Sequence, residues 1–169
     1  MKQIEGGVTA AKGFRAATCA AGIKYQGRTD MAMVTCDVPC ECAGTFTSNV
    51  VKAACVQWDM ELAYSGRPMQ AVVVNSGIAN ACTGKEGWDA CEATAKAVEK
   101  ATGIAASSVA VASTGVIGMQ LPVSKLTSGV LSMSGELSDT LEAGTAASKA
   151  IMTTDTINKE IAVTFEAGG

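Results

Sequence analysis

The stretch Val109-Ala-Val-Ala-Ser-Thr-Gly-Val-Ile-Gly118 sets the pattern from which the rest of the chain can be interpreted. Its β-branched and alanine residues predict a buried strand, which then changes at Ser113-Thr114-Gly115 into small polar residues and a glycine. Backbone N–H groups at such a strand end can bind an anion or an oxyanion, and Gly115 would let the backbone approach a ligand closely. Ordinary strand-to-loop junctions have the same composition, so this stretch alone leaves both interpretations open.

A second stretch repeats the pattern. Gln70-Ala-Val-Val-Val-Asn75 predicts another buried strand, and the polar, glycine-bearing residues 75–84 follow it. A third polar group, Thr153-Thr-Asp-Thr156, follows a predicted helix. Each of the three can be a local cap or turn, because Ser, Thr, Asn and Asp side chains bond nearby backbone groups. Together they predict a pocket.

The remaining pattern predicts a mixed α/β fold in one domain, 1–169, with sheets packed against helices. Strands are expected at residues 16–23, 31–38, 43–49 and 159–165, and residues 52–58 are expected to form a strand or a sheet edge. Pro39 should end its strand, since proline cannot donate a ladder hydrogen bond. No later segment can pair with residues 159–165, so we expect their partner strand to come from another chain or from residues missing here.

Helices are expected in three places. Residues 88–102 are alanine-rich at near-helical spacing and are followed by Gly103, a plausible C-terminal stop. Pro122 suits the first turn of a second helix, whose apolar face would contain Leu126, Val130 and Leu131. Ser138-Asp139 is the expected cap of a third helix, which carries Leu141, Ala147, Ala150 and Ile151.

Composition limits the classes of function. The 169 residues are 48% hydrophobic, which is enough for one domain with a real core. Only 17% are charged and 4% aromatic, and the net charge of −3 comes without basic clusters, which argues against nucleic-acid binding. There is no run of 18 apolar residues and no apolar signal-peptide core at the start, so we expect a cytoplasmic protein without a membrane anchor. The many small residues favour a partner chain.

The chain has seven cysteines and no histidine. Cys36, Cys40 and Cys42 form a C-x3-C-x-C cluster, but zinc sites use about four ligands in paired spacings, so we expect free thiols and no metal. Without histidine, neither a Ser-His-Asp nor a Cys-His arrangement can be completed within this chain. Ser113 and Cys82 are therefore poor candidates for a nucleophile.

Five motifs occur in an order typical of one family. They are Gly6-Gly-Val-Thr-Ala-Ala-Lys-Gly-Phe14, Cys36-Asp-Val-Pro39 with Ala43-Gly-Thr-Phe-Thr-Ser-Asn49, Val74-Asn-Ser-Gly-Ile-Ala-Asn-Ala-Cys-Thr-Gly84, Ala112-Ser-Thr-Gly-Val-Ile-Gly118, and Ala150-Ile-Met-Thr-Thr-Asp-Thr-Ile-Asn-Lys-Glu160. Over essentially its whole length the chain resembles the ornithine acetyltransferase (glutamate N-acetyltransferase) family of arginine biosynthesis.

The resemblance implies a fold and a reaction. The fold would be the self-cleaving ornithine acetyltransferase/aminopeptidase-like one, in which the precursor cuts itself before a threonine into an α chain and a β chain. This sequence is similar to the α chain, ending before the expected cut, and the assembly would be an α2β2 heterotetramer. The new N-terminal threonine of the β chain would take the acetyl group from N-acetylornithine and pass it to glutamate, without a cofactor. The resemblance leaves open whether acetyl-coenzyme A also serves as a donor.

The resemblance also assigns residues. Thr114 and Gly115 match the oxyanion-hole pair, and Thr153 matches a substrate-contacting position. Asn75 and Asn80 either line the pocket rim or stabilise their loop. Two features depart from the family pattern: Ile78 stands where asparagine is usual, which would remove a polar group near the pocket, and the cysteines at 36, 40 and 42 replace alanine or serine. The competing classes are an aminopeptidase-like enzyme of the same architecture, with water as acceptor, and a non-catalytic binding subunit.

Overall fold

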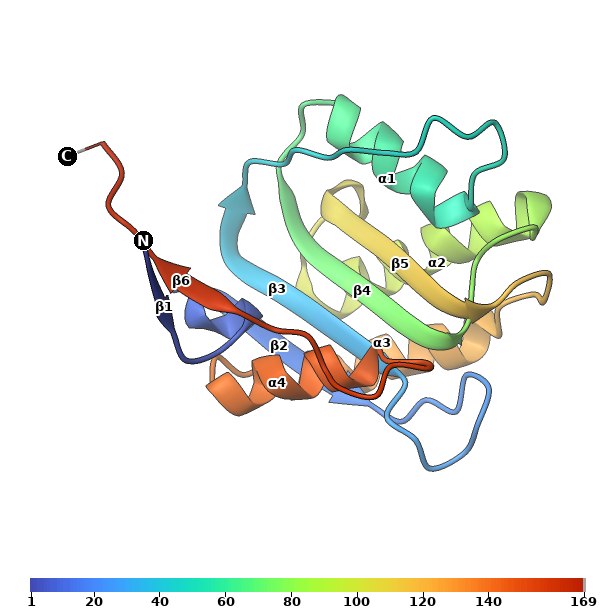
Figure 1. The fold of residues 1–169 in the computed structure, drawn as a ribbon. Helices are drawn as coiled ribbons and strands as arrows, with labels where there is room; N and C mark the ends of the chain where they lie inside the picture. Colours follow the sequence, from blue (N-terminus) through green and yellow to red (C-terminus); the bar gives the residue numbers. More distant parts are fainter. Residues whose placement is uncertain (169) are drawn as a thin grey trace.

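A computed structural model describes residues 1–168 of the chain, which form a mixed α/β fold around one four-stranded sheet (Figure 1). The strand order is β2 (Phe14–Cys19), β3 (Met31–Cys40), β4 (Met69–Ile78) and β5 (Val109–Val116). The first two neighbouring pairs are antiparallel, whereas β4 and β5 are parallel. Parallel neighbours need a long crossover connection, and α2 (Gly84–Thr102) provides it.

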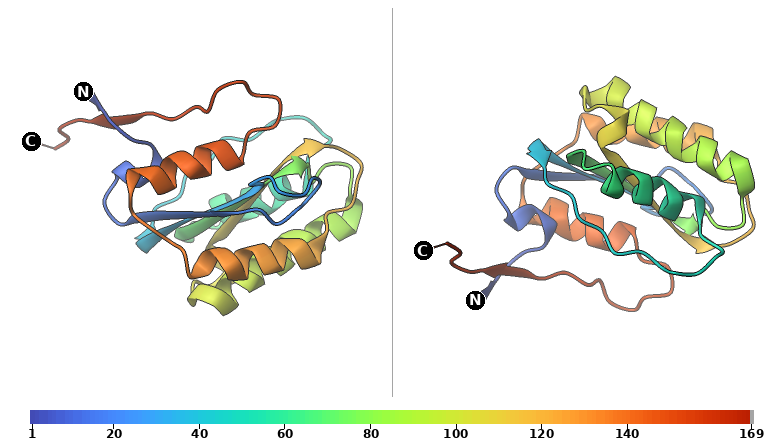
Figure 2. Two further views of the ribbon diagram at one scale, coloured as in Figure 1. Left: turned by 90° about the horizontal axis from the view of Figure 1, so that it is seen from below. Right: turned by 90° about the horizontal axis from the view of Figure 1, so that it is seen from above.

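Helices cover the two faces of the sheet unequally (Figure 2). On one face lie α2 and α3 (Val123–Ser134), with α1 (Ala54–Tyr64) packed along β5 and α2. Alternate residues of each strand point to this face, and they form the main core: Met31, Met33, Ala71, Val73, Val109 and Val111 are all buried. The prediction of sheets packed with helices is confirmed.

The opposite face is only partly covered. There α4 (Leu141–Ala150) packs on β2 and β3 through small side chains, and Ala16, Ala32, Ala147 and Ala150 form a second buried cluster. On β4 and β5 the same face carries Val72, Val74, Ala112 and Thr114, which are all half-buried. We call these four residues the β4–β5 outer face.

A short two-stranded ribbon joins the two ends of the chain (Figure 1). It consists of β1 (Lys2–Ile4) and β6 (Ala162–Thr164), paired antiparallel. The expectation that residues 159–165 find no partner strand within this chain is therefore wrong, because the partner lies about 160 positions earlier in the sequence. Two single 3-10 turns, η1 (Val8–Ala10) and η2 (Ala106–Ser108), complete the elements, and Gly169 lies outside the described residues.

Three strand predictions need correction. Residues 43–49 have no regular secondary structure, since their backbone finds no neighbouring strand to pair with. Most of the predicted strand 52–58 belongs instead to α1, which starts at Ala54. Cys55 and Leu62, seven positions apart, lie on one side of this helix and are both buried. β3 continues through Pro39 to Cys40, since a register shift after Thr35 frees the proline from ladder pairing.

The helix predictions hold with small shifts. α2 ends at Thr102, and Gly103 follows in the left-handed conformation with φ +80°. α3 starts after Pro122 and buries Leu126 and Val130, whereas Leu131 is exposed, contrary to prediction. The cap of α4 is Thr140, whose hydroxyl accepts the Ala143 N–H, and not Ser138-Asp139. Within residues 1–168, no helix combines the length and apolar character needed to cross a bilayer.

Candidate functional site

The first residues of each of the two polar stretches predicted to follow strands belong to the strand itself. β4 continues to Ile78 and β5 to Val116, so the predicted strand ends at Asn75 and Ser113 come too early. The parallel register pairs Asn75 with Ser113, Ser76 with Thr114, and Gly77 with Gly115. The polar residues of both stretches thus meet residue by residue at one end of the sheet.

Gly115 is required by the close approach of the two strands. Its φ is +137°, and a Cβ at this position would lie 2.3 Å from both the carbonyl carbon and the carbonyl oxygen of Gly77. No real side chain fits at such a distance. The paired glycines therefore bring the two backbones together beside Thr114.

The edge of β5 presents backbone donors in a regular order. Val111 donates its N–H to the Asp59 carboxylate at 3.0 Å, and the Ser113 N–H lies on the side of the Cys55 thiol, whose pKa it lowers against the larger, opposite effect of burial. Because alternate residues of a strand point their N–H groups to the same edge, this alternation places the Gly115 N–H on the edge of β5 that faces away from β4. Within residues 1–168 the half-buried Thr114 hydroxyl has no hydrogen-bond partner. Two adjacent residues thus offer donors for which the described part of the chain supplies no partner.

Asn75 holds the ends of the two strands together. Its side chain is buried; the amide nitrogen donates to the Ile78 carbonyl at 2.9 Å, and the amide oxygen accepts the Ser113 hydroxyl at 2.7 Å. Ile78 itself is buried in the main core. The side chain at position 78, where the chain departs from the family pattern, therefore takes part in the apolar packing of the main core.

Asn80 fixes the loop that leads into α2. The side chain is fully buried; its nitrogen donates to the Gly87 carbonyl at 2.8 Å, and its oxygen accepts the Thr83 hydroxyl at 2.7 Å. The same nitrogen lies 3.1 Å from the Cys91 sulfur. Of the two roles considered for Asn80, this geometry fits the loop-stabilising one.

Asn80→Ala tests that role. We expect the free energy of unfolding to fall by about 1–3 kcal/mol, because the buried Gly87 carbonyl and Thr83 hydroxyl lose their partner. Urea unfolding of the full-length protein measures the loss, with the exposed Asn49→Ala as the matched control. Equal, small losses in the two variants would contradict a stabilising role.

Thr153 is brought to the same end of the sheet by a bond that sequence reasoning missed. Thr153 is half-buried just after α4, and its N–H donates to Asp155 at 3.3 Å. Three residues earlier, the Ala150 carbonyl accepts the Ser76 hydroxyl at 2.7 Å. Since Ser76 is paired with Thr114, the segment after α4 is attached beside the Thr114–Gly115 pair. Only the position of Ser76 between Asn75 and Gly77 could have drawn attention to it.

The cysteines supply no activated thiol that the structure identifies. All seven are free. Burial raises the pKa of Cys19 to about 11 and that of Cys91 to about 12, so both are protonated and poorly nucleophilic at neutral pH. Cys82 is exposed in a left-handed turn with φ +58°. Nowhere in residues 1–168 do three His, Cys, Asp or Glu side chains come together as metal ligands.

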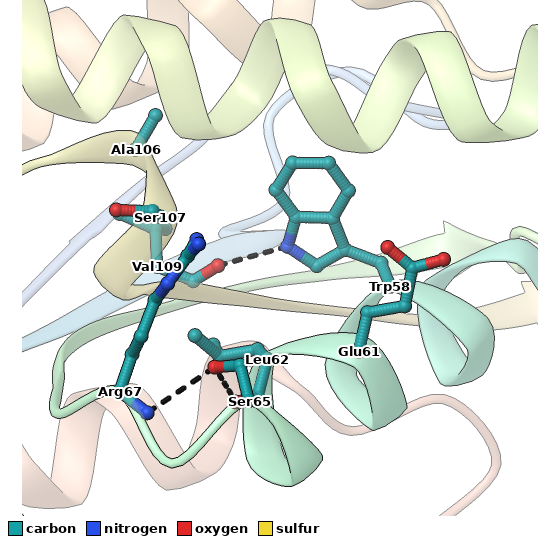
Figure 3. Close-up of a pocket in the computed structure, with 8 residues that line it drawn as sticks. All are labelled: Trp58, Glu61, Leu62, Ser65, Arg67, Ala106, Ser107 and Val109. Atoms are coloured by element: carbon teal, nitrogen blue, oxygen red, sulfur yellow. Dashed lines mark hydrogen bonds between the residues drawn. The ribbon is translucent and has the colours of Figure 1, made fainter.

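A cavity of about 270 Å³ lies away from this site (Figure 3). It is lined by Trp58, Glu61, Leu62, Ser65, Arg67, Ala106, Ser107 and Val109. The Trp58 indole nitrogen donates to the Val109 carbonyl at 2.9 Å. Val109 begins β5, whereas Thr114 lies five residues further on, roughly 16 Å along the strand. The cavity is therefore at the opposite end of the sheet.

Asp59 gives the β5 edge a pH-dependent stability. Burial raises the pKa of its carboxyl to about 6, despite the hydrogen bond from Val111. An unfolded aspartate titrates near pH 4, so as the pH rises from about 4 to about 6 the unfolded state loses this proton first. The contribution of Asp59 to stability is thus fully present below about pH 4 and is lost by about pH 6.

We expect Asp59→Asn to remove this part of the pH dependence. Urea unfolding at several pH values between 4 and 7 should show a smaller fall in stability for the variant than for the unmodified protein. The exposed Asp139→Asn serves as control and should keep the original slope. Identical slopes for all three proteins would contradict the raised pKa.

Comparisons with known proteins agree with this arrangement. Residues 15–169 match the model of the ArgJ family. The arginine biosynthesis bifunctional protein ArgJ of Thermosynechococcus vestitus is 45% identical over 99% of this chain and 40% of its own length. The protein of the same name from Mycolicibacterium paratuberculosis is 47% identical over 94% of this chain and 41% of its own length.

Solved structures show the same fold. The ornithine acetyltransferase of Mycobacterium tuberculosis, solved in complex with ornithine, is 46% identical with a TM-score of 0.88, over 95% of this chain and 86% of that one. The bifunctional protein argJ of Bacillus halodurans is 40% identical with a TM-score of 0.85, over 92% of this chain and 80% of that one. The chain belongs to the ArgJ family, which confirms the resemblance drawn from the five motifs. It spans about 40% of the length of the curated relatives it matches.

Proposed function

We propose that this chain is the α-chain part of an acyltransferase that moves the acetyl group of N-acetylornithine to glutamate. The observation that carries the proposal is the pair of unused donors, the Thr114 hydroxyl and the Gly115 N–H, at the end of β5. Family membership supports it, since relatives are named for arginine biosynthesis and one structural relative is an ornithine acetyltransferase.

The proposed reaction has two half-reactions. The N-terminal threonine of the β chain attacks the acetyl carbonyl of N-acetylornithine, and the negative charge on the carbonyl oxygen is stabilised by Thr114 and Gly115. Collapse of this intermediate breaks the amide bond, and the leaving amine takes a proton to give ornithine. The amine of glutamate then attacks the acetyl-threonine ester, which releases N-acetylglutamate and restores the threonine hydroxyl. No cofactor is required, and acetyl-coenzyme A as donor would produce the same acetyl-threonine.

We place the partner chain on the β4–β5 outer face. Val72, Val74 and Ala112 are apolar but only half-buried there, and Thr114 lies on the same face. A chain that covered this face would bury the three apolar side chains and bring its own residues to the oxyanion donors. The family resemblance implies an α2β2 heterotetramer, and the proposed compartment is the cytoplasm, where free thiols stay reduced.

A label-transfer assay on the full-length protein tests the function. N-acetylornithine labelled in its acetyl group is incubated with glutamate, and labelled N-acetylglutamate is the expected product. Labelled acetate whose formation does not depend on glutamate would instead indicate water as acceptor, as in an aminopeptidase-like enzyme. If no label leaves N-acetylornithine, the chain belongs to a non-catalytic protein and the proposal is wrong.

A further inference from the structure

Ser76 and Arg28 together hold the segment that follows α4. We infer that they are positioning residues, which fix the backbone carbonyls of Ala150 and Met152 so that Thr153 is presented to substrate beside Thr114 and Gly115. This inference rests on the proposed function. Neither residue is assigned a role by the family resemblance or by the comparisons described above.

The end of α4 needs donors from outside the helix. The last carbonyls of any α-helix have no intrahelical partner, and an unpaired buried carbonyl is costly. The Ala150 carbonyl accepts the Ser76 hydroxyl at 2.7 Å, and the Met152 carbonyl accepts a guanidinium N–H of Arg28. Both bonds join residues that are far apart in the sequence, so they decide where the segment lies.

Ser76 is suited to positioning the end of α4 because its backbone N–H and its side chain are themselves held in place. Its side chain is 1% exposed, its N–H donates to the Asp30 carbonyl at 2.8 Å, and its strand position is opposite Thr114. Through this hydroxyl, the end of α4 is bonded directly to β4. This buried hydrogen bond is one of the two attachments that set the distance between Thr114 and the segment containing Thr153.

Arg28 makes the second attachment from the loop between β2 and β3. That loop is itself anchored, since the Asp30 carboxylate accepts the N–H groups of Ala21 and Ile23 at 2.8 and 2.6 Å. The cation of Arg28 also lies at the C-terminal end of α4, where the helix dipole favours positive charge. The loop and β4 therefore hold the segment from two sides.

Ser76→Ala in the full-length protein is the main test. We expect the KM for N-acetylornithine to rise about fivefold or more while kcat changes little, because Thr153 loses its position without loss of the oxyanion donors. Hydrogen exchange of the amides of residues 151–154 should become faster. Thr94→Val is the matched control: Thr94 is equally buried, and its hydroxyl donates to the Ala90 carbonyl at 2.8 Å, within α2.

A second pair of variants tests Arg28. Arg28→Met keeps the aliphatic stem and removes the donors, and should raise KM in the same way; Arg28→Lys keeps a cationic donor and should restore most of the affinity. If Ser76→Ala and Thr94→Val show equal KM values and equal exchange rates at 151–154, the inference is wrong. If the unmodified protein transfers no acetyl group, the proposed function fails, and the exchange rates alone still confirm or refute the attachment.

Discussion

We expect Thr114→Ala to lower kcat for the proposed acetyl transfer by about a hundredfold or more in the full-length protein, which is the usual loss when one oxyanion donor is removed. The Thr114 hydroxyl is half-buried and bonds nothing within residues 1–168, so its removal should leave the fold and the assembly intact. Thr114→Ser keeps the hydroxyl and should retain most of the activity. The measurement is steady-state kinetics with N-acetylornithine and glutamate.

A matched control tests whether replacing any threonine by alanine lowers the activity. Thr127 is half-buried on α3, with its hydroxyl bonded to the nearby Ser124 carbonyl, and Thr127→Ala should not change the kinetics. Unchanged turnover in Thr114→Ala would remove the hydroxyl from the mechanism. The Gly115 N–H would then be the one donor that this stretch provides.

Gly115→Ala should destabilise the protein by about 3 kcal/mol or more, the largest stability effect we expect. The new Cβ would lie 2.3 Å from the Gly77 backbone, and the φ of +137° is unfavourable for any L side chain. β4 and β5 would have to separate at the end that carries Thr114. Urea unfolding of the full-length protein measures this loss.

Gly118→Ala isolates the backbone contribution. Gly118 also has a positive φ, +78°, but a Cβ there would meet nothing within 4 Å. We expect a loss of about 1 kcal/mol from conformation alone. If Gly115→Ala costs no more than Gly118→Ala, the close approach of the two strands does not constrain position 115.

The sequence predicted the apolar parts of the sheet and the longest helix well. Residues 70–74 and 109–112 are short β-branched runs, and the alanine spacing of α2 with Gly103 after it admits few other structures. At the polar ends of β4 and β5 the sequence pattern wrongly predicts loops, because Asn, Ser and Gly are typical of loops. Strand pairing stabilises them here, and a single-sequence pattern does not show pairing.

The sequence pattern also does not predict contacts between residues that are far apart in the chain. The Ser76–Ala150 bond spans 74 positions, and the β1–β6 pairing joins the two ends of the chain. Thr114, Gly115 and Thr153 were assigned only through the family resemblance, since composition alone could not separate a catalytic strand end from an ordinary one. What the structure adds is the attachment of Ala150, three residues before Thr153, to the strand position opposite Thr114, and the reason for a glycine at 115.

The most direct test concerns which chain becomes acetylated. The purified full-length protein is incubated with N-acetylornithine in the absence of glutamate, and the intact mass of each of its chains is determined. We predict the mass of one acetyl group on a second chain that begins with threonine, none on the chain containing Thr114 and Gly115, and less of this adduct in Thr114→Ala at early times. An acetyl group on the chain containing Thr114 and Gly115 would contradict a role confined to stabilising charge.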